Sequence, residues 1–178
     1  MPEQQTGAPP RRLIIIAAVI AVAFAVAVAV LSLVNRTKPE QDNGPLALAA
    51  VPAPQAGSAE CAALVPALPA QLISNGATLN RREIAEPAPP ATVAWGAPDA
   101  IVLRCGLDRP TELTPTSQLR VVSGVQWLPV EGQGSSTWYL VDRNVYAGLT
   151  VPDSAGTGPL QMVSDTVAKT LKPVPLRF

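Results

Sequence analysis

The two cysteines are the residues best suited to chemistry in this sequence. Cys61 lies in "SAECAALVP", Cys105 ends the apolar run "AIVLRC", and the 178 residues contain no histidine. A nucleophilic cysteine needs a base, a metal site needs about four ligands, and a redox pair is usually Cys-x-x-Cys. None of these conditions is met. The sequence therefore predicts a structural disulfide between Cys61 and Cys105, with two buried free thiols as the alternative.

The acidic residues give little support for catalysis. Neither Ser-x-x-Lys nor Gly-x-Ser-x-Gly occurs in the sequence. Asp99, Asp108, Glu112 and Asp142 each stand beside a turn residue or an arginine, as solvated or capping carboxylates do. A hydrolase with paired carboxylates stays open as an alternative, because pairing in space is invisible in a sequence. We predict no catalytic residue, no metal ligand and no cofactor.

Charge and composition exclude some classes of partner. Thirteen basic residues balance thirteen acidic ones, so no overall field would attract nucleic acid. With 48% hydrophobic and 15% charged residues, the chain has room for one ordinary domain and its attachments. Several of the 20 prolines fall before Cys61, in a segment rich in alanine. This segment is typical of an extended tether.

Residues 13–34 form an uncharged apolar run near the N-terminus. As a helix it would extend about 33 Å, enough for a hydrocarbon core of about 30 Å. The alternative is a cleaved signal peptide, whose apolar region is usually shorter. We therefore expect a cytoplasmic tail (1–12), a single-pass transmembrane helix (13–34), a Pro/Ala-rich tether (35–57) and an extracytoplasmic domain (58–178). The paired cysteines favour an oxidising, extracytoplasmic location for that domain.

Periodicity predicts the elements of the domain. A helical stripe follows Cys61, with Ser58 as its N-cap. Alternation predicts a strand ending at Cys105, one strand over residues 119–127, and an antiparallel hairpin over residues 136–151. Residues 159–171 have the pattern of a closing helix that buries Leu160, Val163, Val167 and Leu171. The expected fold class is α+β, a mostly antiparallel sheet of about five strands with helices packed on one face.

The predicted hairpin also supplies a candidate interaction patch. "TWYLVDRNVY" places Trp138, Tyr139 and Tyr146 around Arg143 at a tight turn. Aromatic residues with an arginine are common anchors of protein interfaces. The alternative is that the rings cover a small core and that Arg143 only closes the turn.

Four segments together resemble an actinobacterial family of membrane-anchored, exported proteins of unknown function. The segments are "CAALVPALPAQL", "AWGAPDAIVLRCG", "LTPTSQL…VSGVQW" and "VDRNVYAGLTVP", and the resemblance covers residues 58–171. It implies an N-terminal anchor and an extracytoplasmic domain with paired cysteines. It supplies no catalytic residues.

These observations favour a non-enzymatic binding or scaffolding module of the cell envelope. The expected partners are the membrane, through the anchor, and an envelope protein or glycolipid, but not nucleic acid. The alternative function is a carboxylate-dependent enzyme that acts on peptidoglycan or lipid precursors.

Overall fold

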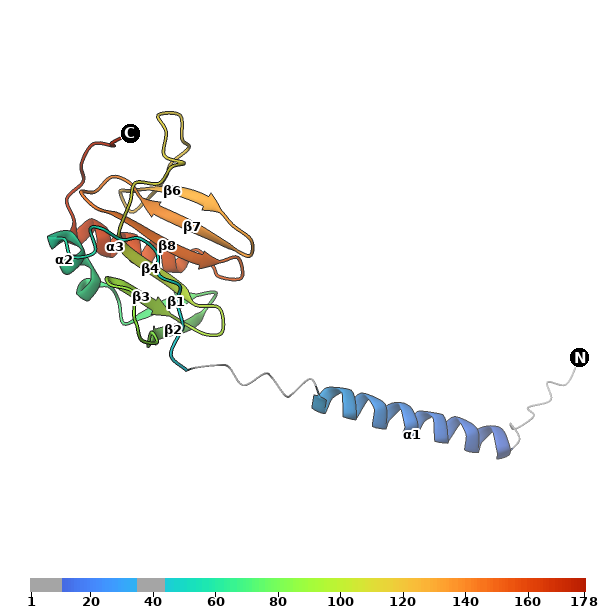
Figure 1. Cartoon of the computed structure of the whole chain (residues 1–178). Coiled ribbons are helices and arrows are strands. Elements are labelled where there is room, and N and C mark those ends of the chain that lie inside the picture. Colours follow the sequence, from blue (N-terminus) through green and yellow to red (C-terminus); the bar gives the residue numbers. More distant parts are fainter. Residues whose placement is uncertain (1–10, 35–43) are drawn as a thin grey trace, which may run out of the picture. The chain divides into compact units, whose positions relative to one another are not determined.

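The structure, a computed structural model, describes residues 11–34 and 44–178. The chain divides into two units, residues 1–41 and 42–178. In the first unit the described residues form helix α1 (Arg11–Val34) (Figure 1). The predicted cytoplasmic tail, apart from residues 11 and 12, and residues 35–43 of the predicted tether lie outside the described residues.

The expectation of a transmembrane helix over residues 13–34 is contradicted by the structure. α1 covers these positions, but no helix in the described part of the chain combines the length and apolar character needed to cross a membrane.

The second unit is built on one antiparallel sheet of eight strands, so the expectation of about five strands was wrong. In sheet order they are β1-β2-β3-β4-β8-β7-β6-β5 (Figure 1). β4 and β8 are neighbours, and this pair joins the first four strands to the last four. The strands are β1 (Gln71–Ser74), β2 (Ala77–Arg82), β3 (Thr92–Trp95), β4 (Ile101–Leu107), β5 (Arg120–Val122), β6 (Val125–Glu131), β7 (Ser135–Leu140) and β8 (Tyr146–Pro152).

Two tight turns account for much of the difference between the expected and the observed number of strands. Asn75 and Gly76 both have positive φ, 49° and 78°, and they join β1 to β2. Ser123 and Gly124, at 49° and 74°, turn the chain between β5 and β6, where a single strand over residues 119–127 was expected. Two residues with positive φ match the twist of an antiparallel pair. The second turn therefore makes two strands from one predicted run, whereas the first forms a hairpin where no strand was predicted.

Helices α2 (Ala59–Ala67) and α3 (Gly158–Thr170) lie on one face of the sheet (Figure 1). The Ser58 side chain accepts a hydrogen bond from the Cys61 amide at 3.3 Å, which confirms the predicted N-cap. Arg81 of β2 donates to the carbonyl oxygens of Val65 and Leu68, at 3.1 and 2.8 Å. These carbonyls lie at the C-terminal end of a short helix, where no later amide of the helix can pair with them, so they need partners outside it.

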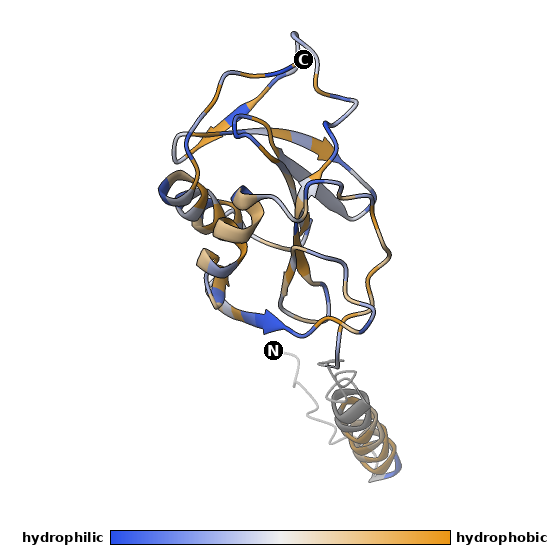
Figure 2. Ribbon diagram, turned by 60° about the vertical axis from the view of Figure 1, so that its left-hand side comes forward, coloured by the Kyte–Doolittle hydropathy of each residue, from blue (hydrophilic) through white to orange (hydrophobic). Residues whose placement is uncertain are grey.

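The main core lies between these helices and the sheet. Figure 2 shows apolar colouring in the strands at the middle of the domain and along the helices beside them. The predicted stripe of α3 is confirmed, because Leu160, Val163, Val167 and Leu171 are all buried. Trp95 and Trp127 are the largest buried side chains of this core. The Trp127 indole donates to Ser164 Oγ at 2.9 Å, which gives its N–H a partner inside the core.

A second, smaller core covers the other face of the sheet. Its buried members are Leu107, Leu113, Leu128, Val141 and Tyr146. Ala53 and Leu176 pack against it, so chain segments from both ends of the unit contribute. The helices cover one face of the sheet, and non-helical segments cover part of the other. Apolar side chains are therefore buried on both faces.

Residues 44–57, which were assigned to the tether, belong to the second unit and make hydrogen bonds with its other segments. Leu46 forms a parallel bridge with Ile84. Further on, the Gln55 amide donates to the carbonyl oxygen of Gly106 at 3.0 Å. Gly106 has φ +89°, and a Cβ built on it would fall on the backbone of Gln55 and Ala56. The folded unit therefore includes residues before 58.

The predicted disulfide between Cys61 and Cys105 is confirmed. The S–S distance is 2.06 Å and the Cα–Cα distance is 5.7 Å. Both residues are buried in the main core, Cys61 on α2 and Cys105 on β4. The bond joins a peripheral helix to a strand at the middle of the sheet, across 44 residues of sequence.

Candidate functional site

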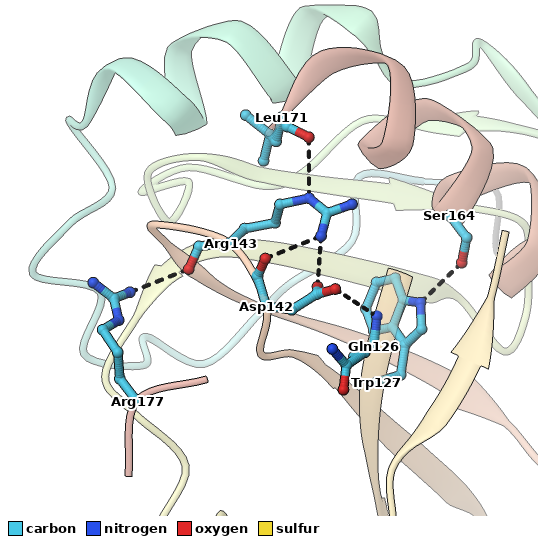
Figure 3. A network of polar contacts seen from close by, with 7 residues as sticks. All are labelled: Gln126, Trp127, Asp142, Arg143, Ser164, Leu171 and Arg177. Atoms are coloured by element: carbon cyan, nitrogen blue, oxygen red, sulfur yellow. Dashed lines mark hydrogen bonds and ion pairs between the residues drawn. The ribbon is translucent and has the colours of Figure 1, made fainter. Parts of the chain in front are cut away.

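Arg143, the centre of the predicted interaction patch, is buried with a relative exposure of 2%. Its Nε donates to the carbonyl oxygen of Leu171 at 3.1 Å, and its Nη1 donates to the carbonyl oxygen of Asp142 at 3.0 Å. Nη1 also lies 2.7 Å from Asp142 Oδ1 (Figure 3). The guanidinium thus joins the β7–β8 connection to the end of α3 and is unavailable to an external partner.

Asp142 is equally buried, contrary to its interpretation as a solvated or capping carboxylate. Its Oδ2 accepts from the backbone amide of Gln126 at 3.1 Å (Figure 3). A buried carboxylate is tolerated when a cation and a hydrogen-bond donor both satisfy it. Asp142 and Arg143 are therefore structural residues.

The three aromatic members of the predicted patch do not lie on one surface. Trp138 and Tyr139 are consecutive on β7, so their side chains point to opposite faces of the sheet. Trp138 packs against the main core, and Tyr139 packs against the second core. Tyr146 is buried, with the Arg177 guanidinium 5.5 Å from its ring centroid. The structure does not bring the four residues together: Trp138 lies on the opposite face of the sheet from Tyr139 and Tyr146, and Arg143 turns inward to the end of α3.

Trp138 does line a groove of about 760 Å³ between β5, α3 and the ends of β7 and β8. Trp138, Val151 and Leu160 give the groove an apolar floor. Arg120 and Asp153 stand on its rim, and both are exposed. The remaining lining residues are Leu119, Val121, Val122, Ser136, Pro152, Ala155, Gly156, Thr157 and Gln161.

The groove has the features of a binding site for an apolar group. Ligand sites are concave and mostly apolar, with a few polar groups that fix orientation. Within the described residues, the Arg120 side chain makes no hydrogen bond or ion pair, so its guanidinium is free to meet an acidic or carbonyl group. The groove offers a place to bind and orient a ligand.

The sequence matches the family described as Protein of unknown function (DUF3515) over residues 18–176. The chain belongs to this family. No curated protein and no solved structure matches it.

A second polar cluster lies on the opposite face of the sheet in this DUF3515 protein. Arg104 of β4 and Tyr139 of β7 lie on either side of Gly148 of β8, and each is directly opposite this glycine in its strand pair. Burial lowers the pKa of the Arg104 guanidinium, and Tyr139 partly opposes this change. Burial also raises the pKa of the Tyr139 phenol; Glu112 raises it further and Arg104 lowers it. Both shifts come mainly from desolvation, as expected for polar groups beside a small apolar core.

The carboxylates considered for catalysis are either exposed or already engaged in structural contacts. Asp99, Asp108 and Glu112 are exposed, and Asp142 is engaged in the buried network. Among the described residues, no three side chains of the His, Cys, Asp or Glu type are grouped as a metal site would require.

Sequence reasoning missed the groove because it missed the turn at Ser123 and Gly124. As one continuous strand, residues 119–127 place Val121 on the same face as Trp127. In the observed hairpin, Trp127 is opposite Arg120, so Arg120 and Val122 share its face, and all three point to the helix side. The available signal was the Ser-Gly pair between two alternating apolar runs, a pattern typical of a two-residue turn.

Proposed function

We propose that this DUF3515 protein is an extracytoplasmic, non-enzymatic binding module of the cell envelope. In this proposal the groove between β5 and α3 receives an apolar group of another envelope component. The observation that carries the proposal is the groove itself, with Trp138, Val151 and Leu160 below and Arg120 free on the rim. A binding role needs such a surface, whereas acid–base catalysis needs a positioned base.

The location is inferred from the disulfide. A buried bond between Cys61 and Cys105 is typical of proteins that fold in an oxidising compartment. Both cysteines of the chain are used in it. This supports a site of action outside the cytoplasm.

Crosslinking from the groove in the native cell envelope tests the binding role. A photoreactive amino acid replaces Gln161, which is exposed on the rim, in the full chain. The matched control carries the same group at Lys169, which is exposed on the same helix but outside the groove. We expect a discrete adduct, with protein or glycolipid, from position 161 only. No adduct at 161, or the same adducts from both positions, would contradict the proposal.

A further inference from the structure

We infer that the occupant of the groove is an extended polypeptide segment that adds as a ninth strand to the free edge of β5. This inference rests on the proposed function and specifies its partner. It is carried by the hydrogen-bonding direction of Val121, the position of the groove beside that edge, and the free charge of Arg120.

The neighbouring strand fixes the direction of the Val121 backbone groups. Gln126 of β6 is directly opposite Val121. The Gln126 amide donates to Asp142 Oδ2 at 3.1 Å, and its carbonyl oxygen accepts from the Val141 amide at 3.2 Å. Both backbone groups of Gln126 therefore point away from β5, so Val121 and Gln126 form a non-hydrogen-bonded pair.

It follows that the N–H and C=O of Val121 point outward from the sheet. β5 is the last strand in the sheet order, and the Val121 side chain is 69% exposed. An antiparallel or parallel segment laid beside β5 would satisfy both groups, as in other cases of strand addition to a sheet edge. A residue of the added strand that lies opposite Val121 could exchange both hydrogen bonds with it, one as donor and one as acceptor.

The groove lies on the side where an added strand would place alternate side chains. Arg120 and Val122 point to the helix side of β5, and both line the groove. Every second side chain of the incoming segment would also face this side. An apolar side chain there would lie over Trp138 and Leu160, and an acidic one would meet Arg120. The expected segment therefore alternates and combines apolar and acidic residues on one face.

The same features disfavour the two other occupants. A lipid chain would fill the apolar floor but would make no use of the Val121 amide and carbonyl, which would stay bonded to water. A second copy of β5, paired antiparallel about Val121, would place two Arg120 side chains diagonally on one face, where like charges repel. A polypeptide with an acidic residue uses both backbone groups and brings the opposite charge to Arg120.

A displayed library of random twelve-residue peptides, selected on the purified full chain, provides the probe. The decisive variant is Val121→Pro, which removes the outward N–H; proline is tolerated at the edge of a sheet where no ladder bond is lost. The matched control is Val121→Thr, which keeps the N–H and the β-branched shape. Melting temperature verifies that both variants are folded.

We expect enriched peptides in which every second residue is apolar or acidic, so that residues of both kinds share one face. Val121→Pro should weaken binding of a selected peptide about fivefold, since one hydrogen bond contributes roughly 1 kcal/mol. Val121→Thr should change binding less than about twofold, within the few tenths of a kcal/mol usual for surface substitutions. Arg120→Glu should weaken the acidic peptides and provides a second variant if Val121→Pro does not fold.

Two results would overturn the inference. One is a library that yields no enriched peptide, and the other is a selected peptide that binds equally well to wild type, Val121→Pro and Arg120→Glu. If crosslinking from position 161 nevertheless captures a partner, the groove remains a binding site and only the strand-addition mode fails. If crosslinking also yields nothing, the proposed function fails as well.

Discussion

Arg143 illustrates what residue type and spacing leave open. An arginine between aromatic residues at a turn is common at interfaces, and this pattern predicted an interaction patch around Arg143. The structure places the guanidinium against the carbonyl oxygens of Leu171 and Asp142, inside the domain. Nothing in the local pattern shows that α3 ends beside this turn. The direction of a long side chain depends on contacts with distant segments, which a local pattern does not contain.

The buried position of Arg143 predicts a large effect on stability. Arg143→Ala leaves the Asp142 carboxylate buried without its cation and should lower the free energy of unfolding by about 3–5 kcal/mol. Arg143→Lys should cost less, because it keeps a charge but loses the planar fork. Arg120→Ala, at an exposed arginine, is the control and should cost less than about 0.5 kcal/mol. Denaturant unfolding measures all three, and an Arg143→Ala protein as stable as the control would contradict the buried network.

Tyr139 predicts a dependence of stability on alkaline pH. Burial raises the pKa of its phenol, so the folded state holds this proton more tightly than the unfolded state, where the pKa is about 10. The unfolded state ionises first as the pH rises. This contribution to stability is therefore complete below about pH 10 and is lost as the pH rises through the raised folded pKa.

Tyr139→Phe removes that titration while keeping the ring. The decline in unfolding free energy between about pH 9 and pH 11 should be shallower in the variant than in the wild type. Denaturant titrations at several pH values measure the two slopes. Identical slopes would show that the Tyr139 proton is held equally in both states.

At the scale of elements, sequence periodicity predicted what local patterns determine. The β7–β8 hairpin and α3 follow directly from alternation and from a helical stripe. The β5–β6 hairpin was taken for one strand, because alternation continues through Ser123 and Gly124. The groove was lost with that turn, since it depends on which face Arg120 and Val122 occupy. Residues 44–57 were taken for a tether because a segment that packs without forming a helix or strand has no periodic pattern of apolar residues in its sequence.

The contact between residues 44–57 and β4 gives an element-scale prediction. Gly106→Ala places a Cβ on the backbone of Gln55 and Ala56 and also strains a positive φ. Gly124→Ala is the matched control, because it has a similar φ of +74° with open space around it. The control should cost about 1 kcal/mol in unfolding free energy, and Gly106→Ala should cost clearly more, by about 1–3 kcal/mol. Equal losses in thermal or denaturant unfolding would show that the segment does not pack on Gly106.

At the scale of the whole molecule, the pairing of β4 with β8 organises the second unit. It joins two groups of consecutive strands into one sheet, and α2 and α3 cover one face of it. No sequence pattern could indicate this pairing, because it brings Leu103 opposite Leu149 across a long separation. The cysteines were an exception: with no other chemistry open to them, their number and types were enough to predict a contact between α2 and β4.

The disulfide yields the last prediction. Reduction releases a constraint on 44 residues of unfolded chain, a loop whose closure contributes about 4 kcal/mol by the chain-entropy relation. The double variant Cys61→Ala with Cys105→Ala should therefore lose about 4 kcal/mol of unfolding free energy. The loss of two buried side chains adds to this, because each leaves a small cavity. Reduced wild type, which keeps both side chains, is the control that separates the entropic part from the packing part. Stability of the double variant equal to that of oxidised wild type would contradict a structural role, and two alkylatable thiols in freshly isolated, non-reduced protein would contradict the bond itself.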